Sequence, residues 1–309
     1  MPGLLDKRLL FVTGKGGVGK TTVAAALGLA AARAGRRTIV CEVARQERLT
    51  QMFGRPPAGY REVELAERLW AISVDPEHAQ EEYLRDQLPS RTLASLLAHS
   101  SLFTYLSAAT PGLRELVTVG KLWELAQLER RDPRKAPYDL VVVDAPATGH
   151  GLAMLTAPRT FRDVARVGPI ARQADTIHAF LADPARTGIV AVALAEETPV
   201  TETIELGGRL RAELGTAPDA IVVNALYPER FTNEEAERIA AACDEARTPQ
   251  LRAALRAALS QHRRARTQRA QLRRLRRAAG PVWTLPYVFE PELGVGELER
   301  LSRELERKL

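Results

Sequence analysis

Residues 14–22 read GKGGVGKTT, and this stretch is the most specific pattern in the chain. The apolar run LLFV precedes it, and the alanine-rich run TTVAAALGLAAARAG follows it. G-x-x-x-x-G-K-T between a strand and a helix is the pattern of a phosphate-binding loop, in which backbone N–H groups and a helix N-terminus surround an anion. The stretch therefore predicts an α/β fold with a nucleotide phosphate site. A chance glycine-rich turn is the alternative.

Each residue type in this stretch has a role in phosphate binding. Glycines let the backbone approach the anion and adopt conformations closed to other residues. Lys20 is expected to neutralise the β- and γ-phosphates as a catalytic residue, and the Thr21 hydroxyl to bind Mg²⁺. The ATP- or ADP-binding residues predicted here are Gly14, Gly16, Gly17, Val18, Gly19, Lys20, Thr21 and Thr22.

Apolar runs alternate with helix-length segments along the whole chain, which is typical of βα units on a buried parallel sheet. The strands predicted are 9–13, 38–43, 70–74, 140–143, 188–194, 220–223 and 282–285. We expect a single domain over 1–309, with a doubly wound, mostly parallel sheet and helices on both faces. Strand patterns are missing from 76–133, which predicts a helical insertion, and 158–184 reads as a second helical segment.

A second motif, YDLVVVDAPATGHG, occupies residues 138–151. Its apolar strand ends in Asp144, at the carboxyl edge of the sheet where ligands of open α/β folds collect. Asp144 is therefore a candidate catalytic residue that holds Mg²⁺ through water. A helix N-cap is the alternative role for this carboxylate.

The basic charge of the chain is concentrated in one segment. The net charge is +6, and ten arginines lie between Arg252 and Arg277. We expect these arginines to form a solvated helix face rather than a nucleic-acid or lipid site. The buried side of the same helix is predicted to be marked by leucines 251, 255, 259, 272 and 275.

Other sequence features restrict the class of protein. Cys41 and Cys243 are the two cysteines of the chain, too few and too far apart for a disulfide framework or a zinc site. No apolar run approaches the length of a membrane helix, and the N-terminal residues lack signal-peptide features. We expect a cytoplasmic protein, with transient membrane contact left open.

The loop also resembles that of a known family. GKGGVGKT carries a second lysine, Lys15, as in the deviant P-loop ATPases that include MinD, the nitrogenase iron protein and the ArsA-like ATPases. Thr148-Gly149-His150 resembles the end of switch II, D-T-A-P-T-G-H, in the ArsA-like and tail-anchored-protein-targeting (anion-transporting) ATPases. Ala145, Pro146 and Ala147 depart from its middle. The resemblance implies a nucleotide-closed dimer in which Lys15 reaches the facing subunit's phosphate.

The resemblance extends over nearly the full chain. In AIVVNALYP, Asn224 stands where the family has an asparagine that pairs with the adenine edge, although it could also be a turn residue. The loop predicted to close over the base is Pro286, Tyr287, Val288 and Phe289. Glu202-Thr203 and residues 111–116, PGLREL, match further family segments.

The chain also departs from the family pattern. Switch I has Glu42 where the family has an aspartate that positions water, so we expect Glu42 to support slow hydrolysis. The three-cysteine arsenite site, the C-x-x-C zinc clasp and the Met-rich groove of the targeting ATPases are not present in the sequence. The terminal helix, with Leu298, Leu301, Leu305 and Leu309, is expected to pack on the sheet rather than bind membrane.

The preferred function is a Mg²⁺-dependent ATPase switch, a homodimer that couples ATP turnover to a protein or membrane-protein client. The alternative is a low-activity, non-catalytic or regulatory nucleotide-binding subunit in a heterodimer with a paralogous ATPase. A small-molecule kinase would need an arginine lid, for which Arg159, Arg162 and Arg166 are candidates. A DNA-partitioning protein would use the basic helix. Lys15 and the base-loop resemblance disfavour the kinase, and we expect no nucleic-acid partner.

Overall fold

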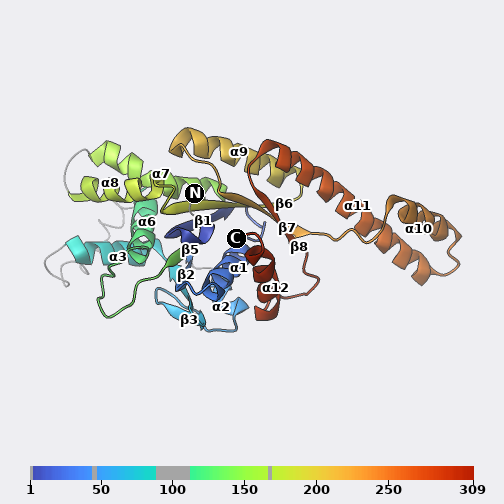
Figure 1. Ribbon diagram of the computed structural model, residues 1–309, viewed down its shortest axis with the longest axis horizontal. Coiled ribbons are helices and arrows are strands. Elements are labelled where there is room, and N and C mark those ends of the chain that lie inside the picture. Colours follow the sequence, from blue (N-terminus) through green and yellow to red (C-terminus); the bar gives the residue numbers. More distant parts are fainter. Residues whose placement is uncertain (1–2, 44–46, 88–111, 166–168) are drawn as a thin grey trace.

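The computed structural model describes residues 3–43, 47–87, 112–165 and 169–309, which build one sheet covered by helices on both faces (Figure 1). The strand order is β3-β4-β2-β5-β1-β6-β7-β8. All neighbours are parallel except β3 and β4. The strands are β1 Leu9–Gly14, β2 Thr38–Val43, β3 Val63–Ala66, β4 Leu69–Val74, β5 Leu140–Asp144, β6 Thr187–Leu194, β7 Ala220–Leu226 and β8 Val282–Pro286.

The central strands are buried on both faces because helices cover both sides of the sheet. Along β1, Leu9 and Phe11 belong to one core and Leu10 and Val12 to the other, as the period of two in a strand requires. A strand with two buried faces shows a continuous apolar run in the sequence. All seven strands predicted from such runs are confirmed, each to within about one to three residues at its ends.

One face of the sheet is covered by α1 Lys20–Arg33, α2 Arg48–Met52 and α12 Val295–Glu306. Leu298, Leu301 and Leu305 of α12 are fully buried in this core. The expected packing of the last helix is therefore confirmed for these three residues, whereas Leu309 is 37% exposed.

The other face is covered by α6 Leu113–Leu125, α7 Thr148–Ala165, α8 Pro169–Ala182, α9 Glu197–Leu214 and part of α11 Pro249–Ala278. Helix α7 begins ten residues before the segment 158–184 and continues through Pro158. Helix α3, Pro76–Gln87, packs beside α6. Both lie in the range of the predicted insertion, whose residues 88–111 lie outside the described part of the chain, as does Pro111 of the family segment.

Helix α11 extends beyond the sheet, and α10 Asn233–Glu245 packs along it to form an arm at one end of the molecule (Figure 1). Leu272 and Leu275 lie in the core, but Leu251 is 50% exposed. The prediction of one buried leucine side was therefore wrong for Leu251, because the start of α11 lies away from the sheet.

Candidate nucleotide-binding site

The loop between β1 and α1 has a backbone that only glycine accommodates at several positions. Gly17 and Gly19 have φ angles of 83° and 88°, in the left-handed region. A Cβ on Gly14 would lie 2.2 Å from the carbonyl oxygen of Val192, and one on Gly19 would lie 2.3 Å from Nδ2 of Asn224. Residues 14–19 therefore form a loop tightly packed against β6 and β7 at the N-terminus of α1.

The two lysines of the loop have different partners. Lys20 Nζ donates a hydrogen bond to the carbonyl oxygen of Lys15 at 3.1 Å. Burial lowers the pKa of Lys20, and the Asp144 carboxylate opposes this effect. Lys15 Nζ forms an ion pair with Glu202 Oε1 of α9 at 2.7 Å. Both partners of that pair are more than one-third exposed, so the pair is open to solvent.

Thr21 and Asp144 form the candidate metal position. Thr21 Oγ1 donates to Asp144 Oδ2 at 2.6 Å, which joins α1 to the end of β5. Asp144 Oδ1 is buried and has no hydrogen-bond partner among the described residues. Burial raises the pKa of Asp144, and the Thr21 hydroxyl and Lys20 oppose the rise. Hard oxygen donors and an unpaired buried carboxylate oxygen fit a Mg²⁺ ion held beside phosphate.

A cavity of about 920 Å³ surrounds this loop. Of the predicted site residues, Gly16, Gly17, Gly19, Lys20, Thr21, Thr22, Glu42 and Asp144 line it. Its volume lies within the range of sites for small molecules and cofactors. The structure therefore gathers the loop, the end of β2 and the end of β5 around one space at the carboxyl edge of the sheet, as expected for an open α/β fold.

Glu42 lies at the end of β2, next to Asp144 in the β2–β5 register. Its side chain is nearly inaccessible, and Oε1 accepts a hydrogen bond from the backbone N–H of Arg48 at 3.0 Å. Burial is the main reason that the pKa of Glu42 is raised to about 7; Asp144 adds to the rise, and the N–H groups of Leu49 and Arg48 oppose it. The carboxylate is thus held at the N-terminus of α2 as well as facing the cavity.

Asn224 contacts the loop rather than open solvent. Its Nδ2 donates to the carbonyl oxygen of Val18 at 3.0 Å, across β7 to the phosphate loop. In the described part of the chain, the cavity is not lined by any of the residues predicted to contact the base, which are Asn224, Pro286, Tyr287, Val288 and Phe289. Pro291, Glu292 and Leu293, which follow them in the chain, line it instead. The base contact stays a prediction. Tyr287 stacks on Tyr227 with ring centroids 4.5 Å apart, and Phe289 meets both rings edge-on.

The predicted switch II residues open a helix. Thr148 is the first residue of α7, and the N–H of His150 donates to the carbonyl oxygen of Ala147 at 2.9 Å. Gly149 and His150 are exposed, and Thr148 is half-buried. The cavity wall on this side is formed by Ala145, Pro146 and Ala147, which are the positions that depart from the family motif.

Comparison with known proteins gives the family. Residues 7–173, more than half of the chain, match the family of anion-transporting ATPases. The chain belongs to this family. ATPase BagA of Mycobacterium tuberculosis is 33% identical over 240 residues, which cover 75% of this chain and 69% of BagA.

More distant relatives carry other names within the same family. The arsenical pump-driving ATPase of Acidiphilium multivorum is 27% identical over 74% of this chain and 41% of its own length. ATPase ASNA1 homolog 1 of Paramecium tetraurelia is 32% identical over 48% of this chain and 43% of its own length. As a member of this family, the chain is a nucleotide-binding ATPase.

Sequence patterns missed part of the site of this anion-transporting ATPase family member. Arg48, the first residue of α2, lines the cavity. Burial is the main cause of the lowered pKa of Lys20, to which Arg48 adds, and of the raised pKa of Asp144, which Arg48 opposes. Gln51, Met52 and residues 291–293 also line it. None of these residues belongs to a recognisable motif; the only sequence signal for Arg48 is an arginine shortly after a strand whose last residue but one is the acidic Glu42.

Among the described residues, no helix is both long and apolar enough to cross a membrane.

Proposed function

We propose that this ATPase binds ATP with Mg²⁺ in the cavity around the loop and closes as a homodimer. Hydrolysis then changes the position of helices that handle a protein or membrane-protein client. The observation that carries the coupling is α7, one continuous helix from the switch II residue Thr148 to Phe161 at the wall of an apolar cavity. These two residues are 13 positions apart, or about 20 Å along a helix.

The chain's own groups account for phosphate binding. The loop amides and Lys20 compensate the charge of the β- and γ-phosphates. Thr21 and Asp144 would hold Mg²⁺, which would neutralise charge on the phosphates when bound. Gly19 and Asn224 keep the loop against the sheet, so the amides are positioned before nucleotide arrives.

Glu42 is the proposed acceptor of the water proton. A pKa of about 7 leaves a substantial fraction of this carboxyl deprotonated at neutral pH, and such a value suits a general base. The hydrogen bond to the N–H of Arg48 holds the carboxylate toward α2. During turnover the Glu42 carboxylate would have to bind both the Arg48 N–H and the water. This competition supports slow hydrolysis.

Lys15 is available for a facing subunit because its ion pair with Glu202 is weak. At these exposures such a pair is worth about 0.2–1 kcal/mol, so a phosphate group of the partner's nucleotide can replace it. The proposed dimer thus exchanges an intramolecular contact of Lys15 for an intermolecular one.

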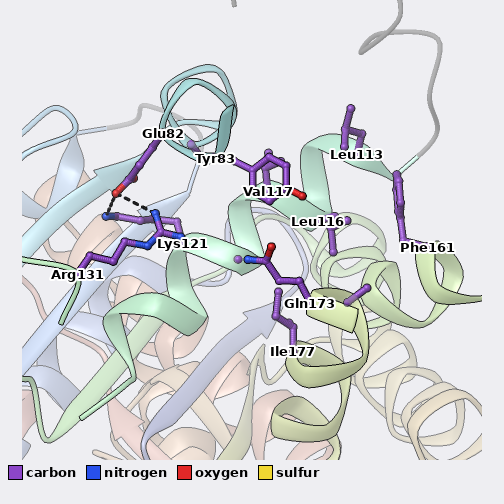
Figure 2. Close-up of a pocket in the computed structure, with 13 residues that line it drawn as sticks. Glu82, Tyr83, Leu113, Leu116, Val117, Lys121, Arg131, Phe161, Gln173 and Ile177 are labelled. Atoms are coloured by element: carbon purple, nitrogen blue, oxygen red, sulfur yellow. Dashed lines mark hydrogen bonds and ion pairs between the residues drawn. The ribbon is translucent and has the colours of Figure 1, made fainter. Parts of the chain in front are cut away.

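The apolar cavity at the far end of α7 is the proposed client contact. Leu113, Leu116 and Val117 of α6 line it together with Phe161 of α7 and Ile177 of α8 (Figure 2). At its edge, Glu82 forms ion pairs with Lys121 at 2.9 Å and with Arg131 at 3.4 Å (Figure 2). Because these charges are paired, the lining favours an apolar segment of a protein over a charged ligand.

Two other functions have less support from the positions of the cysteines and of Glu42. Arsenite is not the proposed cargo because the Cys41 thiol is fully buried in β2, where burial raises its pKa, and Cys243 is buried in α10. The second candidate is a regulatory subunit paired with a paralogous ATPase. The observation that favours it is the engagement of Glu42 with α2, which would leave the catalytic carboxylate to the partner.

The test is the Mg²⁺-dependent ATPase rate of wild type, Lys20→Ala, Glu42→Gln and the exposed-lysine control Lys308→Ala. Oligomer mass is measured with and without a non-hydrolysable ATP analogue. We expect no turnover in Lys20→Ala, at least a hundredfold loss in Glu42→Gln, a wild-type rate in the control and a nucleotide-dependent dimer. A monomer that binds ATP and never turns over would refute the homodimer mechanism and favour the heterodimer.

Coupling to the helices is tested separately by amide hydrogen exchange with and without the analogue. Protection should change in α7 and α6, with α10 as the internal control. Changes confined to the phosphate loop would show that α7 does not transmit the nucleotide state.

A further inference from the structure

A second polar cavity, of about 560 Å³, lies on the arm formed by α10 and α11. Its walls are α11 and the connection from β7 to the start of α10. Four arginines line it, Arg230, Arg266, Arg269 and Arg273, together with His262. The arm lies at the opposite end of the molecule from α3, α6 and α8, as Figure 1 shows.

The arginines outnumber the carboxylates that could neutralise them. The acidic residues of the lining are Glu229 and Glu235. Glu229 lies 3.4 Å from Arg269, and Glu235 accepts the N–H of Thr232 in a capping box. Arg266 and Arg273 form no ion pair with any described residue. The cavity therefore contains uncompensated positive charge.

The positions of these arginines differ from those of an ordinary solvated helix face. Arg266, Arg269 and Arg273 stand at i, i+3 and i+7 on α11, so they share one side of the helix. That side borders the cavity, and Arg266 and Arg273 are at the same time exposed to solvent. Charges of one sign that line a concave site focus their field on it and attract a counter-ion.

Hydrogen bonds between the two walls hold the cavity open in one shape. Gln268 accepts the N–H of Tyr227 at 2.7 Å and donates to the carbonyl oxygen of Ala225 at 3.2 Å. At the other end, His262 Nδ1 donates to the carbonyl oxygen of Phe231 at 3.1 Å. The connection from β7 to α10 is thus fixed to α11 at His262, before the arginines, and at Gln268, between Arg266 and Arg269.

The size of the charged surface indicates a ligand with more than one anionic group. Arg266 and Arg273 are two helical turns apart, about 10 Å along α11. Guanidinium groups bind phosphate oxygens in a forked arrangement, and Arg266 and Arg273 are too far apart along the helix to share one phosphate. Arg269 is engaged by Glu229 and by the carbonyl oxygen of Tyr227. The N-terminus of α10, with Thr232 and Asn233 in the lining, adds the positive end of a helix dipole.

We propose that this cavity binds the phosphate groups of a ligand that carries at least two of them. The source is a free polyphosphate chain or the backbone of a single-stranded nucleic acid. Phe289, 52% exposed, lies beside the cavity under the guanidinium of Arg230, 5.1 Å from the ring centroid. A base could stack on this ring if the ligand is a nucleic acid, whereas a polyphosphate would not use it.

The experiment measures binding of inorganic tripolyphosphate and of a single-stranded oligonucleotide to the full chain by calorimetry at low salt. It uses Lys20→Ala protein without divalent metal, so that the phosphate loop contributes little. The cavity variant is Arg266→Gln/Arg273→Gln. The matched control, Arg256→Gln/Arg263→Gln, removes the same charge from exposed positions of the same helix.

We expect the cavity variant to weaken tripolyphosphate binding at least tenfold and the control to change it less than twofold. Arg266→Lys/Arg273→Lys, which keeps the charge and loses the fork, should fall between them. Tighter oligonucleotide binding that Phe289→Ala weakens would identify nucleic acid as the source; tripolyphosphate binding alone would identify polyphosphate.

The proposal is overturned if neither probe binds at millimolar concentration. It is also overturned if the two double variants weaken binding equally, since that result would reflect only the overall charge of the arm. The arginine substitutions are all at exposed positions of α11, and circular dichroism of each variant verifies that the fold is kept.

Discussion

Shortening the side chain at position 42 tests whether Glu42 holds α2 in place. Its Oε1 accepts the N–H of Arg48 at 3.0 Å, and the side chain is nearly inaccessible. In Glu42→Asp the carboxylate retracts by one carbon–carbon bond, about 1.5 Å. The distance to the Arg48 nitrogen then exceeds the hydrogen-bond range, which ends near 3.2 Å for good geometry.

The expected magnitude follows from the loss of hydrogen bonds at a buried carboxyl. A bond to a charged group contributes about 1.5–3 kcal/mol, and a neutral one about 1 kcal/mol. With a pKa of about 7, Glu42 is partly charged at neutral pH, so we expect Glu42→Asp to lower the free energy of unfolding by about 2 kcal/mol. With a urea m-value of about 3 kcal/mol/M, the midpoint should fall by roughly 0.7 M.

The assay is urea unfolding followed by circular dichroism, with Glu42→Gln as the matched control. The glutamine keeps the length of the side chain and an oxygen that accepts the Arg48 N–H, so its midpoint should stay closer to wild type than that of the aspartate. Glu42→Asp could instead unfold at the wild-type urea concentration and hydrolyse ATP faster. That result would show that the carboxylate does not hold α2 and that its hydrogen bond to Arg48 does not limit where the carboxylate lies.

Three further predictions follow from the same region. Because the pKa of Glu42 is raised from about 4.5 to about 7, its contribution to stability is full below pH 4.5 and is lost as pH rises through 7. The free energy of unfolding of metal-free wild type should therefore fall by about 3 kcal/mol over this range. The same measurement on Glu42→Gln should not show this fall. Glu202→Gln frees Lys15 from an exposed pair worth at most about 1 kcal/mol, so fluorescent-nucleotide titration should show an affinity change of no more than about fivefold. Gly19→Ala would place a Cβ 2.3 Å from Asn224 Nδ2, at a residue whose φ is 88°. The same titration should show that nucleotide binds more than a hundredfold more weakly. Near-normal nucleotide binding would show that the loop can relax.

The buried strands could be predicted from the sequence because their two covered faces produce continuous apolar runs. β3 was missed because the structure buries only Leu65 of its four residues. The turn that joins β3 to β4 includes Arg68, with a φ of 60°, where a glycine or asparagine would have signalled a hairpin. A short edge strand without a turn residue leaves no pattern to recognise.

The phosphate loop could be predicted because its chemistry depends on local residue order. The partners of its side chains could not, since they come from distant strands and helices. Nothing in the sequence near Lys15 indicates an ion pair with Glu202, 187 residues away. The hydrogen bond from Asn224 to Val18 likewise depends on β7 lying two strands from β1.

The packing of α12 on α1 has a consequence for synthesis of the protein. Arg33 of α1 lies 3.4 Å from Glu299 and from Glu306 of α12, and leucines of α12 share a core with α1. The ribosome makes α12 about 260 residues after α1, a delay of roughly 13–50 s at typical elongation rates. During this interval the helix that follows the phosphate loop lacks part of its apolar cover. A nascent chain is therefore expected to need chaperone protection at α1 until α12 has left the ribosome.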